Sequence, residues 1–238
     1  MDRKRNSKIR VINWEKLPIF PQLDRFHPSK FLLVNLARWL SYLLRLFTPG
    51  AWLTCLLQRE DKNGAFYTNP TVSELYQLAS TAYPLGILVF EATLYPLQSY
   101  YTWVCIALIL ECVQYQFWNL VVRPAVDPDY RRYSTSRTLL IILLQYFELA
   151  FSFALIYKNL FPMQFHLQTT NHAATLSSWE ALEFSFVTIS TVGYGSIYAT
   201  PGSGAGILAI GEALCGILGL GVMLATVVSG LKKVGEVE

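Results

Sequence analysis

The residues with the clearest chemical meaning form one short run: Thr188-Ile189-Ser190-Thr191-Val192-Gly193-Tyr194-Gly195-Ser196. Four copies of a TVGYG segment (191–195) can line a narrow pore with backbone carbonyls, which replace the water shell of a dehydrated K⁺. Glycines suit this task because they adopt backbone conformations that other residues avoid, so carbonyls on one side of the strand can point inward. Thr191 can add a hydroxyl at the inner end, and the ring of Tyr194 can pack outward and hold the pore diameter.

The flanking residues predict the elements that would position the TVGYG segment. Ser177-Ser178-Trp179-Glu180 is a capping box, with Ser177 as N-cap and Glu180 at N3, and it predicts a helix that ends near Ser190. The negative end of that helix dipole would lie beside the segment and favour a cation. An apolar helix over 205–229 would then line the pore. Four glycines in it permit close helix approach or bending: Gly211, Gly216, Gly219 and Gly221.

Three earlier apolar segments complete a membrane pattern: 75–95, 101–122 and 138–157. Each has about 20 residues, enough to cross a ~30 Å hydrocarbon core. Tyrosines and tryptophans near the segment ends are typical of an aromatic belt. Together with the helix over 205–229, these segments predict an all-α membrane protein with four transmembrane helices, a pore helix and a re-entrant filter loop.

The overall composition excludes several classes of protein. The chain is 53% hydrophobic and 15% charged, whereas an average soluble domain carries about 25% charge. This excludes disorder, a nucleic-acid tail and a disulfide-stapled secreted scaffold. The four cysteines lack metal-ligand spacing, and neither a GxSxG motif nor a P-loop occurs. We therefore expect no enzyme, no cofactor and no nucleic-acid partner.

Positive charge is sorted along the chain. Of 19 lysines and arginines, all but Lys158 lie in residues 1–62, in residues 123–137 or at Lys232 and Lys233. The positive-inside rule then places both termini in the cytoplasm of a multi-pass protein of the cell membrane. With four membrane crossings, every lysine and arginine except Lys158 lies on the cytoplasmic side.

A fifth crossing, by the apolar stretch over 31–57, would place the four arginines of residues 123–137 outside the cell. We therefore expect this stretch to be an interfacial or re-entrant segment. Asn35, Arg38, Ser41 and Arg45 share one face of a helix there. Arg38 and Arg45 are too widely spaced for a voltage-sensor series, and lipid headgroups are their expected partners. The expected organisation is a cytoplasmic N-terminal segment (1–30), an amphipathic interfacial helix and linker (31–74), two peripheral transmembrane helices (75–122), a cytoplasmic loop (123–137), a pore module (138–233) and a short tail (234–238).

Residues 138–233 resemble the outer helix, pore helix, filter and inner helix of tetrameric potassium channels, on the motifs quoted above. The resemblance covers about 40% of the chain and implies that the K⁺ ligands are Thr191, Val192, Gly193 and Tyr194. It also implies an inner-helix hinge near Gly216, for which Gly219 and Gly221 are further candidates. One filter per chain implies a homotetramer.

The segment departs from the family pattern at two positions. Ser196 stands where the family commonly has Asp, and Val187 stands where many bacterial members have Glu. The filter must therefore be braced differently, with Trp179 or Glu183 as possible partners of the Ser196 and Tyr194 hydroxyls. The expected supporting residues are Thr188, Ser190, Gly195, Ser196 and Trp179.

Four acidic residues lie within apolar segments: Glu91, Glu111, Glu148 and Glu212. Intramembrane acids are functional candidates, and protonated or hydrogen-bonded structural roles are equally open for them. Glu212 lies about one turn before Gly216, and our hypothesis is that it braces the inner helix behind the filter. The outer-loop residues His166 and His172 are expected to be solvated rather than pH sensors.

The function that these patterns favour is passive, K⁺-selective conduction through a homotetrameric pore in the lipid bilayer, without voltage sensing. The alternatives are a weakly selective cation channel, a K⁺-transport subunit, or a non-conducting scaffold or sensor of the same fold.

Overall fold

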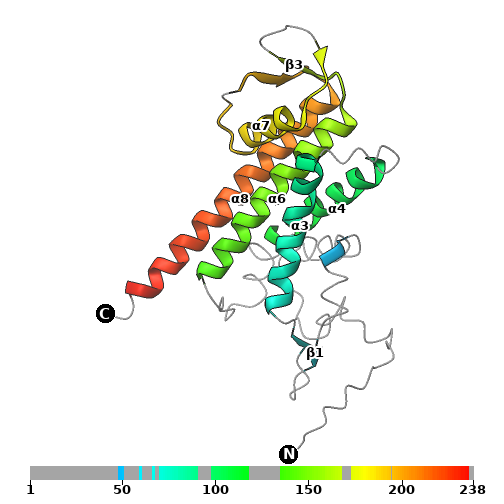
Figure 1. The fold of residues 1–238 in the computed structure, drawn as a ribbon. Coiled ribbons are helices and arrows are strands. Elements are labelled where there is room, and N and C mark those ends of the chain that lie inside the picture. The colour runs from blue at the N-terminus through cyan, green and yellow to red at the C-terminus, as the bar shows by residue number, and fades with distance from the viewer. Residues whose placement is uncertain are drawn as a thin grey trace, which may run out of the picture.

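The computed structural model of the chain describes residues 48–50, 59–60, 66–67, 70–90, 98–117, 135–167, 173–193 and 195–235 (Figure 1). The predicted helix over 31–57 lies outside this set except for 48–50. Tyr194, Glu91 and His172 also lie outside it. The predicted roles of these residues stay predictions.

All four predicted membrane segments contain helices, and their bounds are α3 Pro70–Phe90, α4 Gln98–Phe117, α6 Thr135–Leu160 and α8 Gly204–Gly235. Within the described residues, only two stretches are long and apolar enough to cross a membrane, Ser136–Leu160 in α6 and Gly204–Val228 in α8. One glutamine and one glutamate in α3, and three glutamines and one glutamate in α4, lower the hydropathy of those helices. The structure therefore supports two of the four predicted spans.

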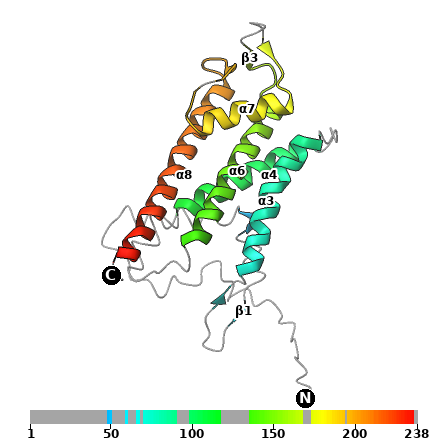
Figure 2. The same ribbon diagram turned by 60° about the vertical axis from the view of Figure 1, so that its left-hand side comes forward.

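Helix α6 is the centre of the molecule and contacts α3, α4, α7 and α8. Figures 1 and 2 both show α6 and α8 running side by side, with α7 lying across one end of the pair. The buried core follows from this arrangement, because the α6 residues Leu149, Ala150 and Ala154 are fully enclosed. Within the chain, 56% of the apolar stretch of α6 is buried, against 22% of that of α8.

A small three-stranded sheet that no sequence pattern predicted lies at the α7 end of the molecule. Its antiparallel strands are β4 Ala173–Ala174, β3 Phe165–Leu167 and β5 Ile197–Ala199, in that order. Phe165 pairs with Ala199 on β5, and its ring packs edge-on against Tyr157 of α6. The sheet thus ties the chain that follows the TVGYG segment to the end of α6. A second pair, β1 Arg59–Glu60 with β2 Phe66–Tyr67, lies at the other end (Figure 1).

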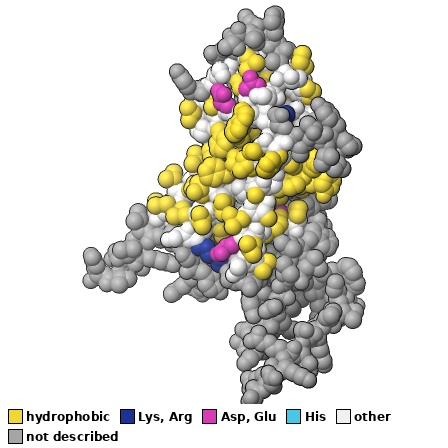
Figure 3. All heavy atoms as spheres, viewed as in Figure 1, with side chains coloured by type: hydrophobic (Ala, Val, Ile, Leu, Met, Phe, Trp, Pro, Cys, Tyr) yellow, Lys and Arg dark blue, Asp and Glu magenta, His cyan; other side chains and the backbone are white. Residues whose placement is uncertain are grey.

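The surface of the described residues has an apolar band. Figure 3 shows hydrophobic side chains gathered over the middle of the α6 and α8 face, with acidic side chains near α7 and mixed charges below the band. An apolar band between polar ends is the surface that a bilayer requires of a helical protein. With the two long apolar helices, it points to a membrane protein.

Candidate functional site

The helix that precedes the TVGYG segment is α7 Ser178–Ile189, and its start is fixed by the predicted capping box. Ser177 Oγ accepts a hydrogen bond from the backbone N–H of Glu180 at 3.3 Å, and the backbone N–H of Ser177 donates to Glu180 Oε2 at 2.8 Å. The prediction of this helix from the sequence is confirmed. The donation from the Ser177 backbone also lowers the pKa of the Glu180 carboxyl.

One cation lies at the start of α7. Lys158 Nζ at the end of α6 donates to Ser178 Oγ at 2.6 Å. This bond joins the last turn of α6 to the first turn of α7, so the two helices hold a fixed angle where they meet. Lys158, the one cation that the charge sorting left on this side, therefore has a defined position.

The end of α7 is held by hydroxyls that fold back onto the helix. Thr188 Oγ1 donates to the Phe184 carbonyl at 2.7 Å, and Ser190 Oγ donates to the Phe186 carbonyl at 2.6 Å. Both residues were predicted as filter supports. In the structure their hydroxyls add a hydrogen bond to carbonyls of the last turns of α7, and the Phe186 carbonyl also accepts from the backbone N–H of Ser190 at 3.1 Å.

The chain turns sharply as it leaves α7. Thr191 has φ 56°, a left-handed conformation that is rare for a residue with a side chain, and Gly193 has φ 64°. Thr191, Val192 and Gly193 are all exposed, and 67% of Val192 is accessible. Three of the residues that the sequence assigns to ion coordination, 191–193, are therefore open to contact with other molecules in the single chain.

The chain then returns to α7 through the two positions that depart from the family pattern. A Cβ on Gly195 would lie 3.5 Å from Val187 Cγ1, which is ordinary van der Waals contact. Ser196 Oγ donates to Glu183 Oε1 at 3.2 Å. Of the two partners considered for Ser196, the structure brings Glu183 to it, whereas Trp179 is 70% exposed on the first turn of α7.

Glu212 lies where three helices meet. Its carboxyl accepts a hydrogen bond from Tyr157 Oη of α6 at 2.7 Å and lies against Ser185 Oγ of α7. Ser185 Oγ is also 2.7 Å from the carbonyl oxygen of Ala150. Glu212 is fully buried, so this cluster connects α8 to the middle of the helix that carries the TVGYG segment.

Gly216 lies one turn beyond Glu212 and touches the end of α7. A Cβ at this position would lie 1.9 Å from the carbonyl oxygen of Ile189 and 2.9 Å from its carbonyl carbon. Only glycine permits this approach between α8 and the backbone that leads into the TVGYG segment. Helix α8 runs through Gly216 without a break, and the hinge role stays a prediction for Gly216, Gly219 and Gly221.

The other described acids also have partners. Glu111 of α4 accepts from the backbone N–H of Gly50 at 3.0 Å and from Tyr76 Oη of α3 at 2.7 Å. Glu148 of α6 accepts from Gln77 Nε2 of α3. These acids join α3 and α4 to the rest of the helices and lie away from the TVGYG segment in sequence and in contacts.

Sequence reasoning missed Tyr157 and Ser185, the two partners of Glu212. They lie 55 and 27 residues from it in the chain, so no local spacing connects them. Tyr157 was noticed only as an aromatic residue near a segment end. Among the described residues, no group of three His, Cys, Asp or Glu side chains could hold a metal ion.

Comparison with known proteins relates part of the chain to a protein family. Searches of curated proteins and of solved structures gave no match for the chain. Residues 141–233 match the family model Ion_trans_2, described as ion channel. The matched stretch contains α7, the TVGYG segment and most of α6 and α8. With two helices that can cross a membrane, it supports a membrane protein with ion channel activity.

Proposed function

We propose that the chain forms a K⁺-selective channel in which four copies surround one pore. The observation that carries the proposal is the placement of the TVGYG segment directly after the C-terminal end of α7, between two helices that can cross a membrane. Such a segment supplies carbonyl oxygens in place of the water around K⁺. The negative end of the α7 dipole favours a cation at the same place.

The exposed surface of α8 supports assembly into a tetramer. A single chain offers one TVGYG segment, and a ring of carbonyls needs four. Large apolar side chains along α8 are mostly accessible in the single chain: Ile207 68%, Ile210 66%, Leu214 56%, Ile217 55%, Leu224 67% and Val228 56%. A face of this size is typical of a surface that binds another protein or lipid. Contact between copies would cover part of it and bring the exposed residues 191–193 together.

The remaining parts of the proposal concern placement in the membrane. We infer that α3 and α4 are peripheral transmembrane helices and that both termini lie in the cytoplasm of a cell-membrane protein. The sorting of lysine and arginine supports this orientation. No cofactor is proposed, and the partners proposed are further copies of the chain, bilayer lipid and the permeant K⁺.

The test is conduction by the purified full chain in liposomes. We expect uptake of a rubidium tracer that Ba²⁺ blocks and that Gly193→Ala abolishes, and a reversal potential that follows the K⁺ gradient. In detergent the particle should have the mass of four chains. A K⁺ to Na⁺ permeability ratio near one would instead support a weakly selective cation channel, which the serine at position 196 and the valine at 187 leave open. The absence of flux with a monomeric or dimeric particle would support the non-conducting scaffold.

A further inference from the structure

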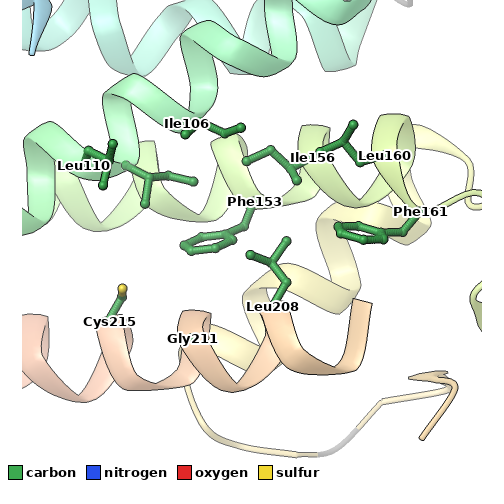
Figure 4. A pocket seen from close by; sticks show the side chains of 10 residues that line it. Ile106, Leu110, Phe153, Ile156, Leu160, Phe161, Leu208, Gly211 and Cys215 are labelled. Carbon is green, nitrogen blue, oxygen red and sulfur yellow. The ribbon is translucent and has the colours of Figure 1, made fainter. Parts of the chain in front are cut away.

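An apolar cavity lies between α4, α6 and α8, away from the TVGYG segment. It has a volume of about 250 Å³. Figure 4 shows side chains from the three helices directed toward the shared space, among them Ile106 of α4, Phe153 of α6, and Leu208 and Cys215 of α8. No charged or hydrogen-bonding side chain other than the thiol of Cys215 lines it.

The chemistry of the walls decides what can fill this space. Enclosed apolar cavities of about 150 Å³ stay free of water and bind small hydrocarbons, and this open cavity has walls of the same apolar kind. A polar ligand would find no partner to fix its orientation there. The occupant must therefore be hydrocarbon, and it must reach the cavity from the hydrocarbon phase.

The opening of the cavity favours one source of hydrocarbon. Two of its walls belong to α6 and α8, the helices that can cross a membrane. Leu110 and Leu160 line the cavity and are 37% and 49% exposed, so they form its rim. In a bilayer, the medium that touches such a rim is the acyl region of the lipid. We propose that a phospholipid acyl chain enters this cavity and binds between α4, α6 and α8.

The bound chain would contact the same turns that hold α7. Leu208, Gly211 and Cys215 lie on one face of α8 by their spacing, and Glu212, which joins α8 to Ser185 of α7, lies in the turn between them. On α6, Phe153 of the cavity wall precedes Tyr157, the other partner of Glu212, by one turn. Occupation of the cavity therefore favours one position of α8 against α7. This regulatory step rests on the proposed channel function, whereas binding of the acyl chain does not.

A pair of glycines provides matched variants. A Cβ on Gly211, in the cavity wall, or on Gly221, which is not part of the wall, would meet no atom within 4 Å. Gly211→Leu should fill part of the cavity, and Gly221→Leu should place the same side chain on the same helix elsewhere. Ile106→Phe narrows the cavity from α4 and serves as a second, independent filling variant. All three are compared with the unchanged chain for helix content and elution volume.

The binding test uses the full chain in phosphatidylcholine liposomes that contain a lipid with a diazirine in one acyl chain. After irradiation, we expect mass spectrometry of peptides to find label concentrated on wall residues such as Leu208 and Ile106. Gly211→Leu and Ile106→Phe should lower that label several-fold, and Gly221→Leu should not. Label spread evenly along the exposed face of α8, with no effect of either filling variant, would show ordinary lipid contact only and overturn the proposal. Loss of label in Gly221→Leu would overturn it as well.

Tracer flux from the same liposomes separates this proposal from the channel proposal. We expect Gly211→Leu to change the flux several-fold and Ile106→Phe, which narrows the same cavity from α4, to change it in the same direction. Label on the wall with no flux in any variant would refute conduction and keep the lipid site. Flux without label on the wall would refute the lipid site and keep conduction. Unchanged flux in a filled variant that has lost its label would refute regulation by the acyl chain.

Discussion

At the scale of single residues, the buried carboxyl of Glu212 joins α8 to both α6 and α7. Glu212→Ala would leave Tyr157 Oη without its acceptor, because that hydroxyl donates to Glu212 at 2.7 Å. Ser185 would keep the Ala150 carbonyl as a partner. We expect a loss of about 1–3 kcal/mol from the free energy of unfolding, the cost of one buried unsatisfied hydroxyl. Thermal unfolding in detergent measures the loss.

The matched variant Glu212→Gln is the control, because its side chain can keep both hydrogen bonds of the carboxyl. Its amide oxygen can accept from Tyr157 and its amide nitrogen can donate to Ser185, which then donates to Ala150. Stability should therefore stay near that of the unchanged chain. In the double variant Glu212→Ala with Tyr157→Phe, part of the loss should return, because no hydroxyl is left without a partner. A fully stable Glu212→Ala chain would contradict the role assigned to this carboxyl.

Ser196 is the residue at which the chain after the TVGYG segment is held to α7. The hydrogen bond from Ser196 Oγ to Glu183 Oε1 is 3.2 Å and exposed, so it adds little to global stability. Ser196→Asp would place two carboxylates side by side, and we expect their repulsion to shorten single-channel openings while thermal unfolding stays unchanged. The double variant Ser196→Asp with Glu183→Gln should restore the openings. Failure of this second change to restore them would mean that Glu183 is not the relevant partner.

At the scale of elements, the crossing of α8 over the end of α7 depends on the absence of a side chain at Gly216. Gly216→Ala would force its Cβ to within 1.9 Å of the Ile189 carbonyl oxygen unless a helix moves. Overpacking of this kind costs about 1–3 kcal/mol, more than the gain of about 0.5–1 kcal/mol from replacing glycine in a helix. We expect lower thermal stability and reduced flux.

Two other glycines of α8 are the controls for this prediction. Added methyl groups at Gly211 and Gly221 meet no atom within 4 Å. Gly211→Ala and Gly221→Ala should be neutral or slightly stabilising, because they remove backbone freedom from the unfolded chain. Equal losses at all three positions would argue for a general need for flexibility in α8, as a hinge would require, rather than for close approach at Gly216.

The elements also show which parts of this fold can be predicted from sequence. The start of α7 was predictable because Ser177 and Glu180 act on each other within one turn. The sheet around β3 Phe165–Leu167 was missed because strands of two and three residues are too short for an alternating pattern. The contact between Tyr157 and Glu212 spans 55 residues. Such contacts depend on how α6, α7 and α8 pack, which local patterns do not encode.

At the scale of the whole molecule, the sorting of charge and the apolarity of the helices lead to different numbers of membrane spans. The two arrangements share one prediction from the charge sorting, which is that the start of α6 faces the cytoplasm and that α7 and β3 lie on the opposite side. They differ only for residues 91–97, between α3 and α4. If α3 and α4 cross the bilayer, these residues lie outside. If the two helices rest against α6 without crossing, residues 91–97 lie on the cytoplasmic side.

A single introduced thiol decides between the two arrangements. In a chain whose four cysteines are replaced by alanine, Thr93→Cys should react with a membrane-impermeant maleimide added outside intact cells, because we expect four spans. Ser134→Cys, before α6, should react only after the cells are opened, and Ser203→Cys, before α8, should react in intact cells. These two controls hold for either arrangement, since α6 and α8 cross in both. If Thr93→Cys behaves like Ser134→Cys, then α3 and α4 do not span. Polar contacts such as Gln77 with Glu148 would then fasten them to the side of a two-helix pore module.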